Sequence, residues 1–200
     1  MEYSWMNTLK EVYLVELLKL HHVEEQLTQK LPQMRDQAQH PELKRVFDKN
    51  LDETRSQMER VESILRKHGA DPQAHQDQSM ERLLAEAEKT LTAPLISDKP
   101  WLRDATLIAW AQKVEHYEIA AYGTVALYAG ILGFNDDRNT LHAILCEKKY
   151  TDYMLARHVN RGTGYTDYML AGHVDLDTRN GPGDPGGPGG PGNPWDPPKI

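Results

Sequence analysis

Several features that mark common protein classes are scarce in, or absent from, this chain of 200 residues. Its single cysteine, Cys146, cannot form an internal disulfide, which favours a reducing, cytoplasmic environment. The longest nearly apolar run, residues 105–111, is far shorter than the ~20 residues of a membrane-spanning helix, and the N-terminus lacks the basic-then-apolar pattern of a signal peptide. A net charge of −7 does not suit phosphate binding. We therefore expect neither a membrane nor a nucleic acid as partner.

Glycine and proline are sparse except near the C-terminal end, and this separates a tail from the rest of the chain. Seven of the 14 glycines and seven of the 12 prolines lie in residues 181–198. Proline removes backbone hydrogen-bond donors and glycine raises the entropic cost of order, so such a segment cannot form a packed core. We therefore expect residues 181–200 to be a disordered, Gly/Pro-rich tail.

The remainder of the chain has the periodicity of long helices. Apolar residues recur three and four positions apart over about residues 8–30, 41–68, 101–132 and 136–159, and a weaker pattern covers residues 79–91. Thr8 followed by Glu11 is typical of a capping box, and we expect Pro32 to kink or interrupt the first helix before it ends near residue 39. Four long helices with a long middle connection predict an all-α four-helix bundle, with a short extra helix in the crossover.

Polar side chains fall on the apolar stripes of all four long helices. Glu24 lies between Leu20 and Leu27, and Glu118 interrupts the apolar series from Val114 to Val125. The same spacing argument turns four further residues toward the interior: Glu53, Gln57, Glu115 and Asp152.

Acids that converge inside a bundle need a compensating charge. A buried carboxylate costs several kcal/mol unless it is paired, protonated or bound to a metal. Two divalent cations, iron or manganese, would cancel the repulsion among several inward acids. Each acid taken alone is more commonly a solvated residue at the rim, so the prediction of a shared interior site depends on the agreement among four helices.

Three segments resemble the YciE/YciF-type ferritin-like stress proteins: QKVEHYEIAAYGT at residues 112–124, LHHVEEQL at 20–27 and LDETRSQ at 51–57. With the region around residues 147–152, the resemblance covers about residues 8–159. It implies a ferritin-like four-helix bundle that forms a homodimer and can carry a di-iron or di-manganese carboxylate centre. Carried over by position, the implied metal ligands are Glu24, Glu53, Gln57, Glu115, Glu118, Glu147 and Asp152.

The last helix departs from the family pattern at one position. Members of the family usually offer consecutive glutamates before a Lys-x-x-Asp, whereas this chain reads CEKKYTD at residues 146–152. Lys148 therefore falls on the line of Asp152, where a second carboxylate is expected, and a protonated lysine has no lone pair for a metal. Two outcomes stay open: Glu147 turns inward and completes the centre, or Lys148 replaces a cation and leaves one metal or none.

We assign structural roles, rather than roles as metal ligands, to the histidines and the cysteine. His116 belongs to the family motif but points away from the acidic stripe, and His158 reaches the bundle end. His21, His22, His40, His68, His75 and His142 share no inward spacing, so we expect them at the surface. Cys146 has no activating partner in the sequence and is expected to be a small buried residue.

An internal duplication suggests where the bundle ends. Residues 150–159 recur at residues 165–174 with nine of ten positions identical, and Gly162 and Gly164 lie between the copies. Because the first copy continues an existing helix, we expect it to hold the core position, with Asp152 inside and Asp167 outside. The predicted organisation is a bundle over residues 1–160, a duplicated short helical segment over 161–180 and the tail over 181–200.

Two functions from different classes follow from these patterns. The first is a stress-response protein whose di-metal centre handles peroxide, oxygen or iron, so that its ligand is a small oxidant or a metal ion. The second is a non-catalytic, stress-associated helical dimer in which inward polar groups set the helix register as a buried ion-pair network. Neither a phosphate loop, a dinucleotide fingerprint, a nucleophile elbow nor zinc-ligand spacing is present, so the sequence leaves enzymatic activity open.

Overall fold

The computed structural model describes residues 6–74, 77–93 and 99–160, with side chains up to Arg157, and the statements below concern these residues. They form five helices: α1 (Leu9–Gln37), α2 (Pro41–Lys67), α3 (Gln78–Leu91), α5 (Pro100–Ile131) and α6 (Asn135–Asn160). Within these described ranges the chain has no β-strand. The predicted all-α fold is therefore confirmed, and the duplicated segment at 165–174 and the tail at 181–200 lie outside the described residues.

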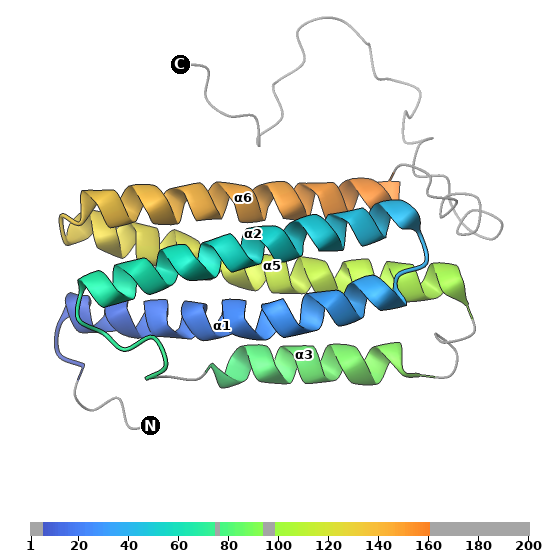
Figure 1. The fold of residues 1–200 in the computed structure, drawn as a ribbon, viewed down its shortest axis with the longest axis horizontal. Coiled ribbons are helices and arrows are strands. Elements are labelled where there is room, and N and C mark those ends of the chain that lie inside the picture. The colour runs from blue at the N-terminus through green and yellow to red at the C-terminus, as the bar shows by residue number, and fades with distance from the viewer. Residues whose placement is uncertain (1–5, 75–76, 94–98, 161–200) are drawn as a thin grey trace, which may run out of the picture.

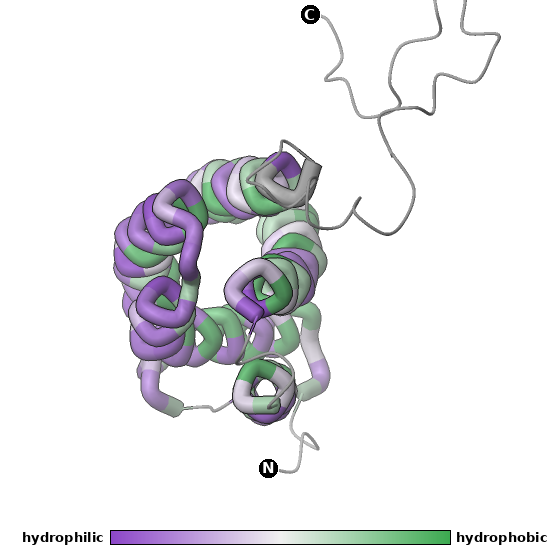
Figure 2. Tube along the Cα trace, turned by 90° about the vertical axis from the view of Figure 1, so that its right-hand side faces the viewer, coloured by the Kyte–Doolittle hydropathy of each residue, from purple (hydrophilic) through white to green (hydrophobic). Residues whose placement is uncertain are grey.

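The four long helices form a bundle, and α3 packs outside it. Short connections join α1 to α2 and α5 to α6, and each of these pairs is in extensive contact. Contacts between α1 and α5 and between α2 and α6 close the ring. Figure 1 shows the long helices side by side with α3 along α1, and Figure 2 shows the bundle from its end. The connection from α2 to α5, which contains α3, is the predicted long crossover.

Local sequence signals set the helix ends. The Thr8 hydroxyl accepts a hydrogen bond from the Glu11 backbone N–H, and the Glu11 carboxylate accepts one from the Thr8 backbone, so the predicted capping box is confirmed. Gly69 and Gly133, just beyond α2 and α5, have φ of 74° and 76°, a region that favours glycine. The helix does not break at Pro32: α1 runs through this residue to Gln37.

The core consists of two apolar clusters separated by a polar layer. One cluster contains Leu27, Phe47, Val114 and Leu155, and the other contains Leu20, Val61, Val125 and Leu145, to name one residue from each long helix. Between them along the helices lie the buried polar residues Glu24, Thr54, Gln57, Glu115, Glu118 and Lys148. The polar layer is the centre of the candidate site.

Helix α3 is attached to the bundle by apolar packing and by polar contacts, among them an ion pair of Glu88 with Lys30 of α1 at 3.4 Å. Met80, Leu84 and Leu91 are buried in the first apolar cluster. Asp77 caps the start of α3 by accepting a hydrogen bond from the Met80 N–H, and its second oxygen accepts one from the Tyr117 hydroxyl of α5 at 2.7 Å. The described helices include none with the length and apolar character needed to cross a bilayer.

Candidate functional site

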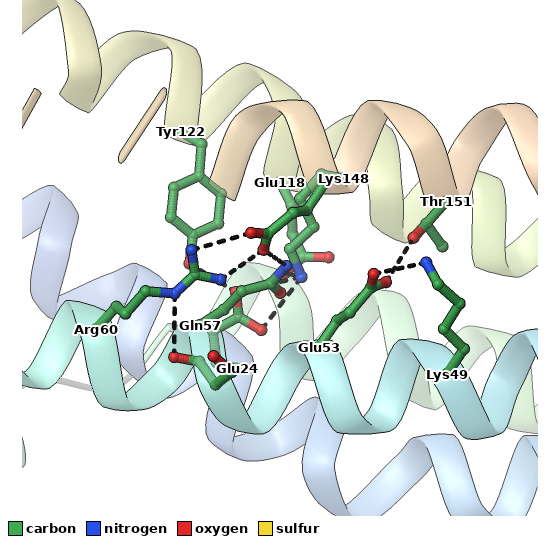
Figure 3. Close-up of polar contacts among 11 residues, drawn as sticks. Glu24, Lys49, Glu53, Gln57, Arg60, Glu118, Tyr122, Lys148 and Thr151 are labelled. Atoms are coloured by element: carbon green, nitrogen blue, oxygen red, sulfur yellow. Dashed lines mark hydrogen bonds and ion pairs between the residues drawn. The ribbon is translucent and has the colours of Figure 1, made fainter. Parts of the chain in front are cut away.

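Lys148 of α6 lies at the centre of the polar layer. Its side chain is 1% exposed, and its ammonium Nζ lies 3.2 Å from each carboxylate oxygen of Glu24 on α1. The same nitrogen lies 2.7 Å from Glu118 Oε1 on α5, and both glutamates are completely buried. Figure 3 shows Lys148 pointing toward both acids. One ammonium therefore joins three helices through two carboxylates.

Neutral donors contact two of the three buried acids. Tyr122 donates its hydroxyl hydrogen to Glu24 Oε1 at 2.6 Å, and Asn50 of α2 donates an amide N–H to Glu115 Oε1 at 2.9 Å. Glu115 is 1% exposed. Within the described part of the chain, Glu115 Oε2 and Glu118 Oε2 have no hydrogen-bond partner, and Glu118 Oε1 faces Lys148 as an ion pair without hydrogen-bond geometry.

Burial shifts the protonation of this cluster. Desolvation raises the pKa of Glu115 to about 7, although Lys148 and the Asn50 hydrogen bond oppose the shift. Desolvation likewise raises the pKa of Glu118 well above its usual value. For Lys148, desolvation favours the neutral amine, but Glu118, Glu24 and Glu115 together outweigh it and raise its pKa. The ammonium therefore stays charged, and a proton on Glu115 would reduce the excess negative charge.

The other acids of the predicted ligand set lie at the edge of the bundle. Glu147 accepts hydrogen bonds from both terminal nitrogens of Arg60, one at 3.0 Å, and a further one from Gln57 at 2.9 Å. Glu53 accepts from Lys49 at 2.6 Å and from Thr151 at 3.2 Å. Glu53 and Glu147 are 24% and 33% exposed, respectively. They open on a groove of about 590 Å³ that is lined by Asp48, Lys49, Asp52, Glu53, Ser56, Arg60 and Glu147.

Asp152 also lies short of the interior. Its carboxylate is 22% exposed, 3.4 Å from His116 Nε2, and it accepts a hydrogen bond from the Gln112 amide at 3.4 Å. The expectation that Asp152 is inside is therefore only partly met, and Asp167 lies outside the described residues. For Glu147, desolvation favours the neutral acid, but the hydrogen bonds from Arg60 and Gln57 outweigh desolvation and lower the pKa of Glu147 overall.

The structure thus divides the seven predicted ligands into two groups. Glu24, Gln57, Glu115 and Glu118 are buried in the layer, whereas Glu53, Glu147 and Asp152 are partly exposed and paired with other side chains. Of the two outcomes left open for α6, the inward turn of Glu147 is not the one observed. Lys148 is the inward residue, because it follows the buried Leu145 by three positions and precedes the buried Thr151 by three.

The sequence alone does not identify some residues of the site. Asn50 and Arg60 lie on α2 among many charged residues, and only their partners reveal their roles. The expectation of His68 at the surface was wrong, because its side chain is 9% exposed and lies 2.6 Å from Asp137 Oδ2. Two further expectations were wrong: His21 is 4% exposed rather than at the surface, and Cys146 is exposed rather than buried, with its sulfur 3.7 Å from His142 Nδ1. Both lie one position from a buried residue, a helical rotation of about 100° that decides between core and solvent.

The buried donor set does not fit the two-metal centre that the resemblance implies. Carboxylate oxygens are suitable ligands for iron or manganese, but an ammonium group has no lone pair, and here it lies between Glu24 and Glu118. The carboxylates that α2 and α6 would contribute, Glu53 and Glu147, contact Lys49 and Arg60 instead. Among the described residues, no group of three or more His, Cys, Asp or Glu side chains is arranged to hold a metal ion.

Comparison with known proteins places this geometry in a family. The model of the family described as "Domain of unknown function (DUF892)" matches residues 8–166. Protein YciF of Escherichia coli strain K12 is 35% identical over 151 residues, which cover 75% of this chain and 89% of YciF.

Solved structures agree with this assignment. The crystal structure of the E. coli stress protein YciF matches with a TM-score of 0.72 and 34% identity, over 78% of this chain and 99% of that one. YcfI of Rhodopseudomonas palustris, titled a putative structural protein, matches with a TM-score of 0.73 and 31% identity, over 78% and 98%. The four-helix bundle with its extra crossover helix is therefore the fold of these relatives, and the chain belongs to the DUF892 family, the YciF-type proteins.

Proposed function

We propose that this protein is a stress-associated, non-catalytic helical bundle whose interior polar layer serves to hold the helices in register. The observation that carries the proposal is the ion pairing of Lys148 with both Glu24 and Glu118 in a layer that is closed to solvent. A buried ion-pair network is a weak source of stability but can specify one register, because any slip would bury unpaired charges. Two apolar clusters separated by one polar layer suit such a role.

The relatives support the same assignment. YciF is described as a stress protein and YcfI as a putative structural protein. Transferred to this chain at 31–35% identity, these descriptions favour a role under stress that depends on the folded bundle itself.

The second candidate is a metal-dependent protein that handles peroxide, oxygen or iron. Its support is three buried carboxylate oxygens, Oε2 of Glu115 and both of Glu118, which lack hydrogen-bond partners within the described chain and would suit iron or manganese. The ammonium beside them argues against it, because a cation brought to Glu118 would meet the positive charge of Lys148 at close range.

We further propose that the protein works as a cytoplasmic homodimer. The outer face of α5 carries Leu127 and Ile131, which are 61% and 64% exposed and lie one helical turn apart. A pair of large apolar side chains in this arrangement suits a contact with a second copy. Analytical ultracentrifugation of the full chain should give a dimer that Leu127→Glu weakens, whereas Leu102→Glu, at a half-buried position near the other end of α5, provides a comparison for general damage to the fold.

Activity measurements separate the two candidate functions. The full-length protein is loaded with Fe(II) or Mn(II), desalted, and assayed for consumption of oxygen and of hydrogen peroxide against buffer with the same residual metal. We expect no turnover above that of the buffer. Turnover that Glu118→Gln abolishes, with the fold retained by circular dichroism, would contradict the structural role and favour the second candidate.

A further inference from the structure

We propose that the ammonium group of Lys148 is a built-in replacement for a divalent cation, so that this one residue makes the polar layer independent of metal. The inference rests on the structural role proposed above and names the residue responsible for it. It starts from the mismatch between a carboxylate-rich layer and a lysine at its centre.

The first support is the position of the charge. Lys148 reaches the layer from α6 and contacts both oxygens of Glu24 and one oxygen of Glu118, which come from α1 and α5. A group that links carboxylates of separate helices in a dry interior does the electrostatic work of a bound cation. The three side chains are 0–1% exposed, so solvent does not screen these contacts.

The second support is that the predicted acidic ligands outside the layer, Glu53, Glu147 and Asp152, are paired with other side chains. Glu147 contacts Arg60 and Glu53 contacts Lys49, both cationic side chains of α2, and the two acids line the groove. Figure 3 shows Glu53 beside Lys49. Asp152 contacts His116 and Gln112. Each of these three acids thus has a partner on the protein, and the charged groups of the layer are the carboxylates of α1 and α5 and the ammonium of α6.

The third support is what a single change would create. In Lys148→Glu a carboxylate would enter the layer from α6, at a position buried between Leu145 and Thr151. It would face Glu24, Glu118 and the partly unpaired Glu115, an all-oxygen set of the kind that Mn²⁺ prefers. The repulsion among these acids would then favour binding of a cation, as it is now relieved by Lys148.

The test measures Mn²⁺ bound per chain and the melting temperature, in Mn²⁺ and in EDTA, for the full-length protein and its variants. Wild type should retain little Mn²⁺ after desalting and melt at the same temperature in both solutions. Lys148→Glu should retain about tenfold more Mn²⁺ and melt higher in Mn²⁺ than in EDTA. Lys149→Glu adds the same charge one position away, at an exposed site, and should behave like wild type.

A second variant decides the matter if Lys148→Glu does not fold. Lys148→Gln removes the ammonium without adding a carboxylate, and Mn²⁺ should raise its melting temperature while leaving Lys149→Gln unchanged. Stoichiometric Mn²⁺ in wild type would overturn the inference, as would two Lys148 variants that respond to Mn²⁺ no more than their Lys149 controls. Metal-free turnover by wild type would instead contradict the proposed structural role and leave the inference about Lys148 standing.

Discussion

At the scale of single residues, the stability of this bundle depends on a lysine that is less exposed than most of its leucines. Lys148→Met removes the only cation in contact with Glu24 and Glu118 among the described residues while keeping an apolar stem of similar length. Breaking a buried ion pair from one side leaves an uncompensated charge, so we expect a loss of about 3–5 kcal/mol in the free energy of unfolding, measured by urea denaturation at neutral pH.

Lys149→Met provides the matched control, because Lys149 is exposed on the same helix and the change should alter stability by no more than about 0.5 kcal/mol. A loss below about 1 kcal/mol in Lys148→Met would mean that the acids of the layer are neutral without it, and the ion-pair description would be wrong.

Glu115 makes the stability depend on pH. Its pKa is raised to about 7 in the folded protein from the usual 4.5, chiefly by burial. A raised pKa means that the folded state binds the proton more tightly, so this contribution is complete below pH 4.5 and is lost as the pH rises through about 7. We expect the urea midpoint of wild type to fall between pH 5 and 8, and to fall less in Glu115→Gln, whose amide resembles the protonated acid. Equal slopes in the two proteins would show that Glu115 does not titrate in this range.

The limits of the sequence as a guide to the site are visible at the same scale. Helical phase alone placed Glu24, Glu115 and Glu118 in the interior and put Lys148 on an inward line, because each lies three or four positions from apolar residues. It also turned Glu53 and Asp152 inward, whereas the structure leaves them 24% and 22% exposed at the flank of their helices, where the rotamer and the partner decide the direction. Arg60 of α2 and Glu147 of α6 are 87 positions apart, and no spacing rule connects them. Lys49 and Glu53, in contrast, lie four positions apart on α2, a helical spacing that the sequence does show.

At the scale of elements, the long helices follow from local signals better than the short one does. The capping box at Thr8, Pro41 at the start of α2 and the glycines at 69 and 133 mark the ends within one or two residues. The start of α3 was placed at Ser79 instead of Gln78, because DQS at residues 77–79 offers two capping side chains. Only the tertiary contact of Asp77 with Tyr117 identifies the residue that matters.

The attachment of α3 yields a prediction of its own. Asp77→Ala removes both the helix cap and the acceptor for the Tyr117 hydroxyl, so we expect faster amide hydrogen exchange across residues 78–91 and a loss of about 1–2 kcal/mol in stability. Tyr117→Phe removes the second contact alone and should lose less. Unchanged exchange in α3 of Asp77→Ala would indicate that Met80, Leu84 and Leu91 hold the helix without polar help.

At the scale of the whole molecule, the arrangement of two apolar clusters around one polar layer is what the proposed structural role would use to favour a single register of the helices. Apolar side chains alone tolerate sliding of one helix along another by a turn, since leucine would again meet leucine. A slip of α6 by one turn would move Lys148 away from Glu24 and Glu118 and bury its charge among apolar residues, at a cost of several kcal/mol. The layer therefore contributes to the choice of structure more than to its stability.

The duplicated segment leads to a prediction about where the folded unit ends. The first copy, residues 150–159, supplies the buried Thr151 and Leu155 and continues α6 without a break, so we predict that the second copy is not needed to fill the core. Ordering a further segment in its place would require loop closure and lost chain entropy without additional burial. Deletion of residues 165–200 should therefore leave helicity unchanged and shift the melting temperature by less than about 2 °C.

The repeat also provides a matched pair of substitutions. Leu155 and Leu170 occupy the same place in the two copies, and only the first lies in the described core, fully buried. Leu155→Ala should cost about 2–5 kcal/mol through loss of packing, whereas Leu170→Ala should leave the urea midpoint within error of wild type. If Leu170→Ala is as damaging as Leu155→Ala, or if the deletion lowers the melting temperature by 10 °C or more (on the order of 3 kcal/mol for a domain of this size), the second copy packs on the bundle or on a partner subunit, and the folded unit extends past residue 160.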